Sequence, residues 1–128
     1  MTLDERIHAA FADGATSSGV ADLITEAEAV AIASGEEAEA VRTRALDPAL
    51  AAVDVAAARR DMEDASFRRD RLGEAVRRLG ERLREVKAEE EQARRQTVYD
   101  AALAERDKLA AELAAYPRRC GKCRASGY

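Results

Sequence analysis

The chain has 128 residues, of which 47% are hydrophobic, 36% charged and only 4% aromatic, so it fits one ordinary domain with few large core side chains. Thirty residues are alanine, whereas glycine (7) and proline (2) are scarce, which excludes a β-sandwich or barrel and favours long helices. The net charge of −4 disfavours nucleic acid as a partner, because phosphate contacts dominate that affinity.

The first 46 residues predict two helices, at about 2–13 and 18–46. Thr2 and Glu5 have the spacing of a capping box, and Gly14 ends the first helix. Ser17 or Ser18 is the expected N-cap of the second helix. Along the second helix, small and apolar residues follow a 3–4 alternation that marks one buried face: Val20, Ile24, Ala27, Ala31, Ser34, Ala38, Val41 and Ala45.

A third and much longer helix is predicted over residues 47–116. Asp47 suits the N-cap and Pro48 the first helical position, and the next proline is Pro117. The polar block Lys87–Gln96 contains neither glycine nor proline, so we expect the helix to continue through it. Gly35, within the second helix, is either a tolerated weak point or the site of a close helix contact.

The first half of this long helix follows a heptad pattern. Nine of ten a and d positions are apolar, and Arg69 is the exception, which predicts a coiled coil. The residues at three successive e positions are small, which indicates either sequence drift at exposed sites or close approach by another helix. These e positions are Ser66, Gly73 and Gly80. The a and d positions are Val55, Ala58, Met62, Ala65, Arg69, Leu72, Val76, Leu79, Leu83 and Val86.

The short Asp-Pro connection predicts an antiparallel hairpin in which the second helix covers about residues 49–76 of the third. Apolar residues beyond that range then need a partner, which self-association would supply. The predicted fold is therefore all-α: a short helix and an antiparallel hairpin with one very long helix, in a coiled-coil or helical-bundle homo-oligomer. The residues of the predicted oligomer seam are Val55, Met62, Leu72, Val76, Leu79, Leu83, Val86, Leu109 and Leu113.

Residues 117–128 form a predicted basic, flexible tail that contains Cys120-Gly-Lys-Cys123. Two thiolates at this spacing are half of a four-ligand zinc site, and the chain offers only His8 besides. We expect no cofactor. The alternatives are a zinc ion held by Cys120 and Cys123 of two chains, and a redox pair.

Four arginines at b and c positions, Arg71, Arg77, Arg78 and Arg84, form a stripe along one side of the third helix. They are candidate phosphate contacts, and equally candidate ion-pair partners for the acidic second helix. The sequence contains no phosphate loop, nucleophile elbow or HExxH motif, so we expect a non-enzymatic protein.

No apolar run approaches the roughly 20 residues that cross a bilayer, so no membrane partner is expected. The residues Met1–Arg6 do not resemble the start of a secretory signal, and the two cysteines lie only three positions apart. Both features favour a cytoplasmic protein.

The block Leu46-Asp-Pro-Ala-Leu50, followed by Met62-Glu-Asp-Ala-Ser-Phe-Arg-Arg-Asp-Arg-Leu72, resembles uncharacterised bacterial coiled-coil proteins, some from prophage-like gene clusters. The resemblance covers residues 15–85 and implies no activity or site residues, but it favours a role in virion assembly or packaging scaffolds. The predicted function is a structural or scaffolding protein that binds itself and another protein. The alternative is a nucleic-acid-associated accessory protein that uses the arginine stripe and the basic tail.

Overall fold

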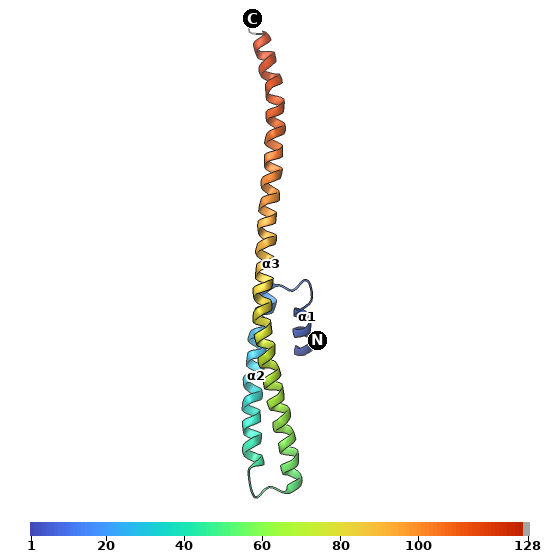
Figure 1. Ribbon diagram of the computed structural model, residues 1–128, viewed down its shortest axis with the longest axis vertical. Coiled ribbons are helices and arrows are strands. Elements are labelled where there is room, and N and C mark those ends of the chain that lie inside the picture. The colour runs from blue at the N-terminus through green and yellow to red at the C-terminus, as the bar shows by residue number, and fades with distance from the viewer. Residues whose placement is uncertain (127–128) are drawn as a thin grey trace. The chain divides into compact units, whose positions relative to one another are not determined.

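The computed structural model describes the backbone of residues 1–126 and the side chains of residues 1–116. The described chain forms three α-helices and contains no strand: α1 (Leu3–Ala10), α2 (Ser17–Ala45) and α3 (Ala52–Ser126) (Figure 1). The prediction of an all-α fold with a long C-terminal helix is thus confirmed for this part of the chain. Two units divide the chain, Met1–Ala88 and Glu89–Tyr128.

The predicted capping box is present at the start of α1. The backbone N–H of Glu5 donates to Thr2 Oγ1 at 3.2 Å, and the N–H of Thr2 donates to Glu5 Oε2 at 2.9 Å. The helix ends at Ala10, three residues before the predicted end, and Gly14 then adopts a φ of +90°. Only glycine enters this left-handed conformation without steric cost, so Gly14 shapes the connection to α2.

Thr16, and not Ser17 or Ser18, is the N-cap of α2. Its backbone is extended, and its Oγ1 accepts a hydrogen bond from the N–H of Gly19 at 3.1 Å. This bond satisfies one of the free N–H groups of the first turn, so the helix begins at Ser17.

The third helix begins at Ala52, five residues after the predicted start. Asp47 caps a turn instead: its Oδ1 accepts from the N–H of Ala49 at 2.9 Å, and its carbonyl accepts from the N–H of Leu50 at 3.2 Å. This turn uses the groups of Asp47 that would otherwise start a helix. The backbone is helical at every residue of 87–96, as predicted, and α3 extends to Ser126, beyond the predicted end at residue 116.

Antiparallel packing of α2 against α3 is fixed by contacts along both helices (Figure 1). Arg44 pairs with Asp61 and Arg68 with Glu37, each at 3.6 Å, so the residue numbers in both pairs add up to 105. Carried to the far end, this register sets the start of α2 beside Val86. The prediction that α2 packs over residues 49–76 of α3 is therefore wrong. The six-residue connection between the helices shifts α2 along α3 by about ten residues.

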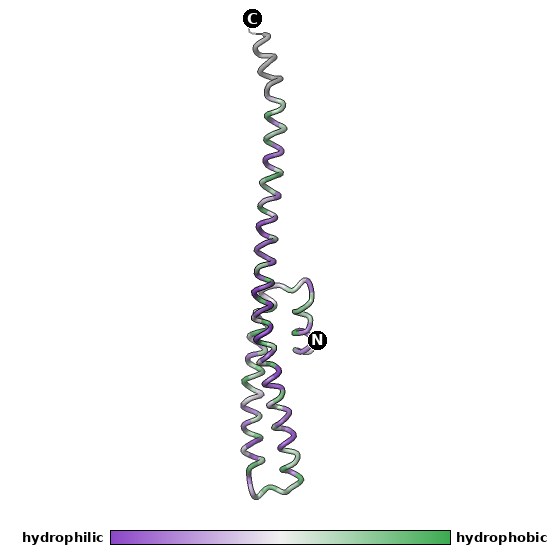
Figure 2. Tube along the Cα trace, viewed as in Figure 1, coloured by the Kyte–Doolittle hydropathy of each residue, from purple (hydrophilic) through white to green (hydrophobic). Residues whose placement is uncertain are grey.

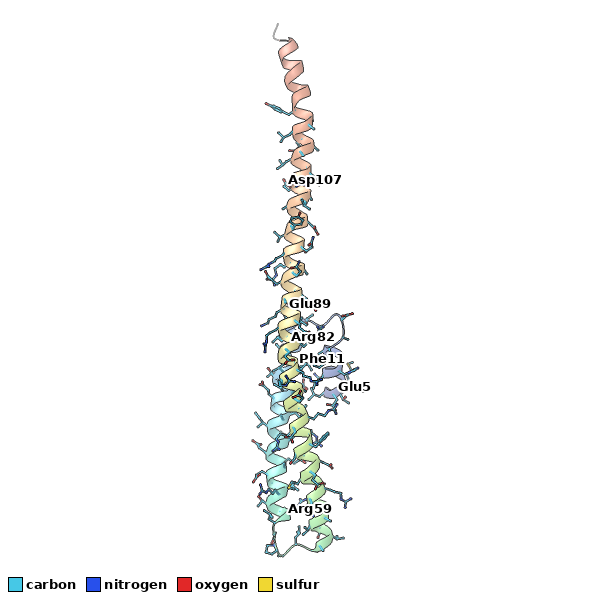
Figure 3. The ribbon with its side chains drawn as sticks, viewed as in Figure 1. Glu5, Phe11, Arg59, Arg82, Glu89 and Asp107 are labelled. Carbon is cyan, nitrogen blue, oxygen red and sulfur yellow. The ribbon has the colours of Figure 1, made fainter. Side chains whose placement is uncertain are left out.

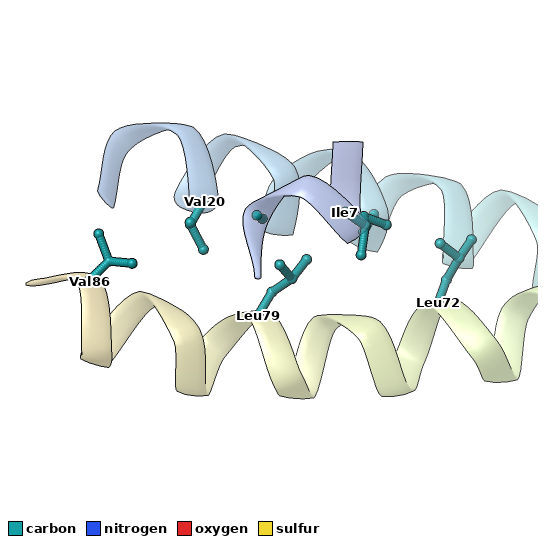
Figure 4. Packing of buried hydrophobic residues seen from close by; sticks show 7 residues of the cluster. Ile7, Val20, Leu72, Leu79 and Val86 are labelled. Atoms are coloured by element: carbon teal, nitrogen blue, oxygen red, sulfur yellow. The ribbon is translucent and has the colours of Figure 1, made fainter. Parts of the chain in front are cut away.

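The core of this unit lies in the seam between the helices, where burial repeats every seven residues. The d positions of α3 are buried, whereas the apolar a positions are half-buried. In α2 the buried residues belong to the predicted row, and α1 adds Ile7 and Ala10 at the end of the hairpin that is remote from the connection (Figures 1 and 4). The buried residues of α2 and α3 are Val20, Ala27, Ser34, Ala38, Ala58, Ala65, Leu72, Leu79 and Val86.

The second unit, from Glu89, consists of helical residues of α3 whose described side chains are exposed or half-exposed. In the part of the chain described, none of the helices combines the length and the hydrophobicity that a membrane crossing requires.

Candidate protein-interaction surfaces

Arg82 holds the end of α1 against α3. Its Nε donates to the carbonyl of Ala10 at 3.0 Å and its Nη2 to the carbonyl of Ala12 at 3.1 Å, while its Nη1 reaches Glu85 at 3.2 Å. The Arg82 side chain is only 11% exposed, and Figure 3 shows it beside Phe11. A cation that binds the free carbonyls at a helix C-terminus is favourable. Heptad spacing gave no signal for this contact, because Arg82 lies at a g position and its acceptors are backbone atoms.

We expect Arg82→Ala to lower the free energy of unfolding of the hairpin by about 1.5–3 kcal/mol, the usual worth of hydrogen bonds to a charged group. Amide hydrogen exchange should accelerate more in α1 than around Ala58, and urea denaturation followed by circular dichroism measures the stability. Arg84→Ala is the matched control, because Arg84 is exposed two residues away. Equal losses in the two variants would contradict the role of Arg82.

A second polar contact joins α1 to α2. Arg6 Nη1 donates to Glu26 Oε2 at 2.8 Å, and Arg6 Nη2 donates to Glu26 Oε1 at 2.5 Å, so the pair is bidentate. The hydrogen bonds from Arg6 lower the pKa of Glu26 below its ordinary value. The acidic second helix is predicted to pair with arginines of the third helix, but Glu26 of α2 pairs with Arg6 of α1 instead.

Most arginines of the predicted stripe are engaged with carboxylates. Arg77 contacts both Glu74 (2.7 Å) and Glu81 (2.8 Å), and Arg78 contacts Glu74 at 3.2 Å. These bonds lower the pKa of Glu74 to about 2, chiefly through the hydrogen bond from Arg77. Arg71 lies 3.9 Å from Asp4 of α1. The pairs reduce the positive charge available to phosphate groups. Their carboxylates belong to α3 itself and to α1, however, and not to the acidic α2 that the sequence indicated.

Arg69 occupies an a position, yet its side chain is about half exposed and its guanidinium contacts Asp70 at 3.1 Å. Its aliphatic stem packs over Gly35: a Cβ added to Gly35 would lie 3.2 Å from Arg69 Cδ. Of the two interpretations of Gly35, the close helix contact is the one found. At Gly73 and Gly80, by contrast, an added Cβ would meet no atom of the described chain within 4 Å.

The nine residues of the predicted oligomer seam fall into three groups. Leu72, Leu79 and Val86 are buried inside one chain, so they are not free to bind a second. Leu109 and Leu113 are 50% and 68% exposed. The others are half-buried, namely Val55, Met62, Val76 and Leu83.

The exposed large apolar residues of the second unit share one side of the helix. Val98 and Leu109 are eleven residues apart, as are Ala102 and Leu113, so each pair returns to nearly the same angle around the axis. Figure 2 shows the hydrophilic stretch of α3 that precedes them and the hydrophobic residues that follow. We call this side the C-terminal stripe. Its members are Val98, Tyr99, Ala102, Leu109, Leu113 and Tyr116.

Among the described residues, no group of three or more histidine, cysteine, aspartate or glutamate side chains is placed to hold a metal ion. The side chains of Cys120 and Cys123 lie outside the described residues, so the shared zinc site stays a prediction. Comparisons of the chain with family models, curated proteins and solved structures find no match.

Proposed function

We propose that this chain is a non-enzymatic structural protein that self-associates and, as an oligomer, presents helical surfaces to a protein partner. The observation that carries the proposal is the C-terminal stripe, because no described residue of the chain covers it. Burial of a large apolar side chain is worth about 1.5–3 kcal/mol, so the stripe offers a substantial driving force for association.

The few stabilising contacts within the second unit also support self-association. Most helical stability in proteins comes from packing of an apolar side, and pairs such as Arg95 with Glu91 (3.2 Å) and Gln96 with Asp100 (2.9 Å) add only a few tenths of a kcal/mol each. A helix of this composition is stabilised chiefly when its apolar side packs against another helix. A second copy would bring an identical apolar side.

The test is analytical ultracentrifugation of the wild-type chain and of Leu109→Glu/Leu113→Glu between 1 and 100 μM. We expect an oligomer for the wild type and at least about 100-fold weaker association for the variant, or about 2.7 kcal/mol, because two charges would enter an apolar interface. Ala104→Glu/Ala111→Glu is the matched control, since both alanines are exposed on the opposite side of the helix. Its association should match the wild type.

A wild-type chain that remains a monomer at 100 μM would overturn the proposal. Steeply salt-dependent binding of the wild type to DNA would instead support the nucleic-acid alternative.

A further inference from the structure

The hairpin has an uncovered face on the side opposite α1, which we call the open face. The grooves beside α1 are lined by Leu23 and Val30 of α2 and by Phe67, Leu72 and Ala75 of α3. At 100° per residue, the open face lies on the other side of the seam. Its residues are Ile24, Glu28, Ala31, Ile32, Gly35 and Glu39 of α2 and Arg69, Gly73, Val76, Arg77, Gly80 and Leu83 of α3.

This face combines apolar side chains with gaps. Ile32 is 65% exposed, an unusual exposure for isoleucine, and Val76 and Leu83 are half-buried. Gly73 and Gly80 lie one heptad apart and leave open space above the α3 backbone. A helix that approached here could therefore bring its side chains into contact with that backbone.

The register of the hairpin determines which residues would meet across a two-fold axis parallel to the helices. Rotation about such an axis does not move a residue along the helix axis. Each α3 residue therefore faces the α2 residue of the second copy for which the two residue numbers add up to 105. Gly73 then faces the partner's Ile32, and Gly80 faces the partner's Thr25. The exposed isoleucine thus meets one of the two gaps.

The charges on the open face select the same arrangement. Glu28 and Glu39 on α2 form no ion pair within the described residues. Arg69 and Arg77 on α3 pair with carboxylates of their own helix, yet about half of each arginine side chain stays exposed on this face. With the axis parallel to the helices, Glu28 faces the partner's Arg77, and Glu39 lies one turn from the partner's Arg69. An axis across the helices would instead set α2 against α2 and α3 against α3, which opposes like charges.

We propose that the open face binds a second copy of this chain in parallel orientation, with α2 of each chain against α3 of the other and Ile32 seated over Gly73. This inference rests on the proposed self-association, and it adds the interface and the orientation. The half-buried Val76 and Leu83 would line the centre of the resulting four-helix bundle, beside Ile24 and Ala31.

The experiment is disulfide cross-linking of the full chain with Cys120 and Cys123 replaced by serine. One preparation carries Ile32→Cys and the other Gly73→Cys, and each is oxidised alone and after mixing through a denaturation and refolding step. We expect a covalent dimer in the mixture and essentially none in either preparation alone. Arg59→Cys is the matched control for Gly73→Cys, because Arg59 is an exposed e position two heptads away. Its mixture with Ile32→Cys should give at least tenfold less dimer.

Each other outcome overturns the inference. Covalent dimers in the single preparations alone would show α2 against α2, or α3 against α3. No cross-link in any mixture, from a chain that sediments as an oligomer, would overturn this interface and leave the proposed self-association intact. A wild-type chain that is monomeric would overturn both.

A second variant tests the interface without added cysteines. Ile32→Glu should weaken self-association at least tenfold, while circular dichroism shows unchanged helicity, because Ile32 is mostly exposed within one chain. Phe67→Glu is the control, since Phe67 is 69% exposed on the side of α1. The same association constant for both variants would overturn the proposal.

Discussion

Replacement of Leu79 by alanine is expected to lower the free energy of unfolding of the hairpin by about 2–5 kcal/mol, the range for leucine lost from a packed core. Leu79 is 0% exposed, and it lies where α1, α2 and α3 meet (Figure 4). Its neighbours Ile7 and Val20 come from two different helices, so all three would have to shift to fill the cavity. With so few large core residues, the hairpin has little else to compensate for the loss.

Urea denaturation of the variant at several protein concentrations measures this effect. Leu46→Ala is the control, because Leu46 is 71% exposed, and its stability should change by less than about 0.5 kcal/mol. The loss at Leu79 should be independent of protein concentration, since its contacts lie within one chain. A loss that disappeared at high concentration would instead place Leu79 in an interface between chains.

Replacement of Ala93 by proline should disrupt α3 after the hairpin. Ala93 is exposed in the middle of the polar block, and proline there removes one backbone hydrogen bond and clashes with the carbonyl of Glu89. Proline should destabilise the helix by about 3 kcal/mol or more. Among its described residues, the second unit has no buried core that would compensate for this loss. Far-ultraviolet circular dichroism should lose helical signal, and amide exchange should accelerate across residues 89–100.

The unfolding midpoint of the hairpin, measured where the chain is monomeric, should remain unchanged in this variant, because every residue of the buried core cluster lies in Met1–Ala88. Ala93→Gly is the control, with an expected cost of about 1 kcal/mol. A lower midpoint for the proline variant would show that the two units stabilise each other. An unchanged helical signal would contradict a continuous helix through the polar block.

The helices and their buried sides could be predicted because periodicity is a local property of the chain. The row from Val20 to Ala45 and the d positions of α3 are the sides that the structure buries. The capping box at Thr2 also followed from the spacing of two residues. The candidate sites were harder to predict, because Arg82 binds backbone carbonyls and the exposure of Ile32 depends on where α3 lies.

The tertiary structure alone decided how far α2 lies along α3. A heptad pattern fixes the angle of a residue around its helix, but a shift of seven residues along an alanine-rich seam leaves the pattern almost unchanged. The turn at Asp47 sets the length of the connection and hence the register, which moves Leu79 and Val86 from the expected interface into the core of one chain. The same register places the aliphatic stem of Arg69 over Gly35. Side-chain periodicity therefore determined which sides of the helices are buried, and the geometry of one turn determined what each side is buried against.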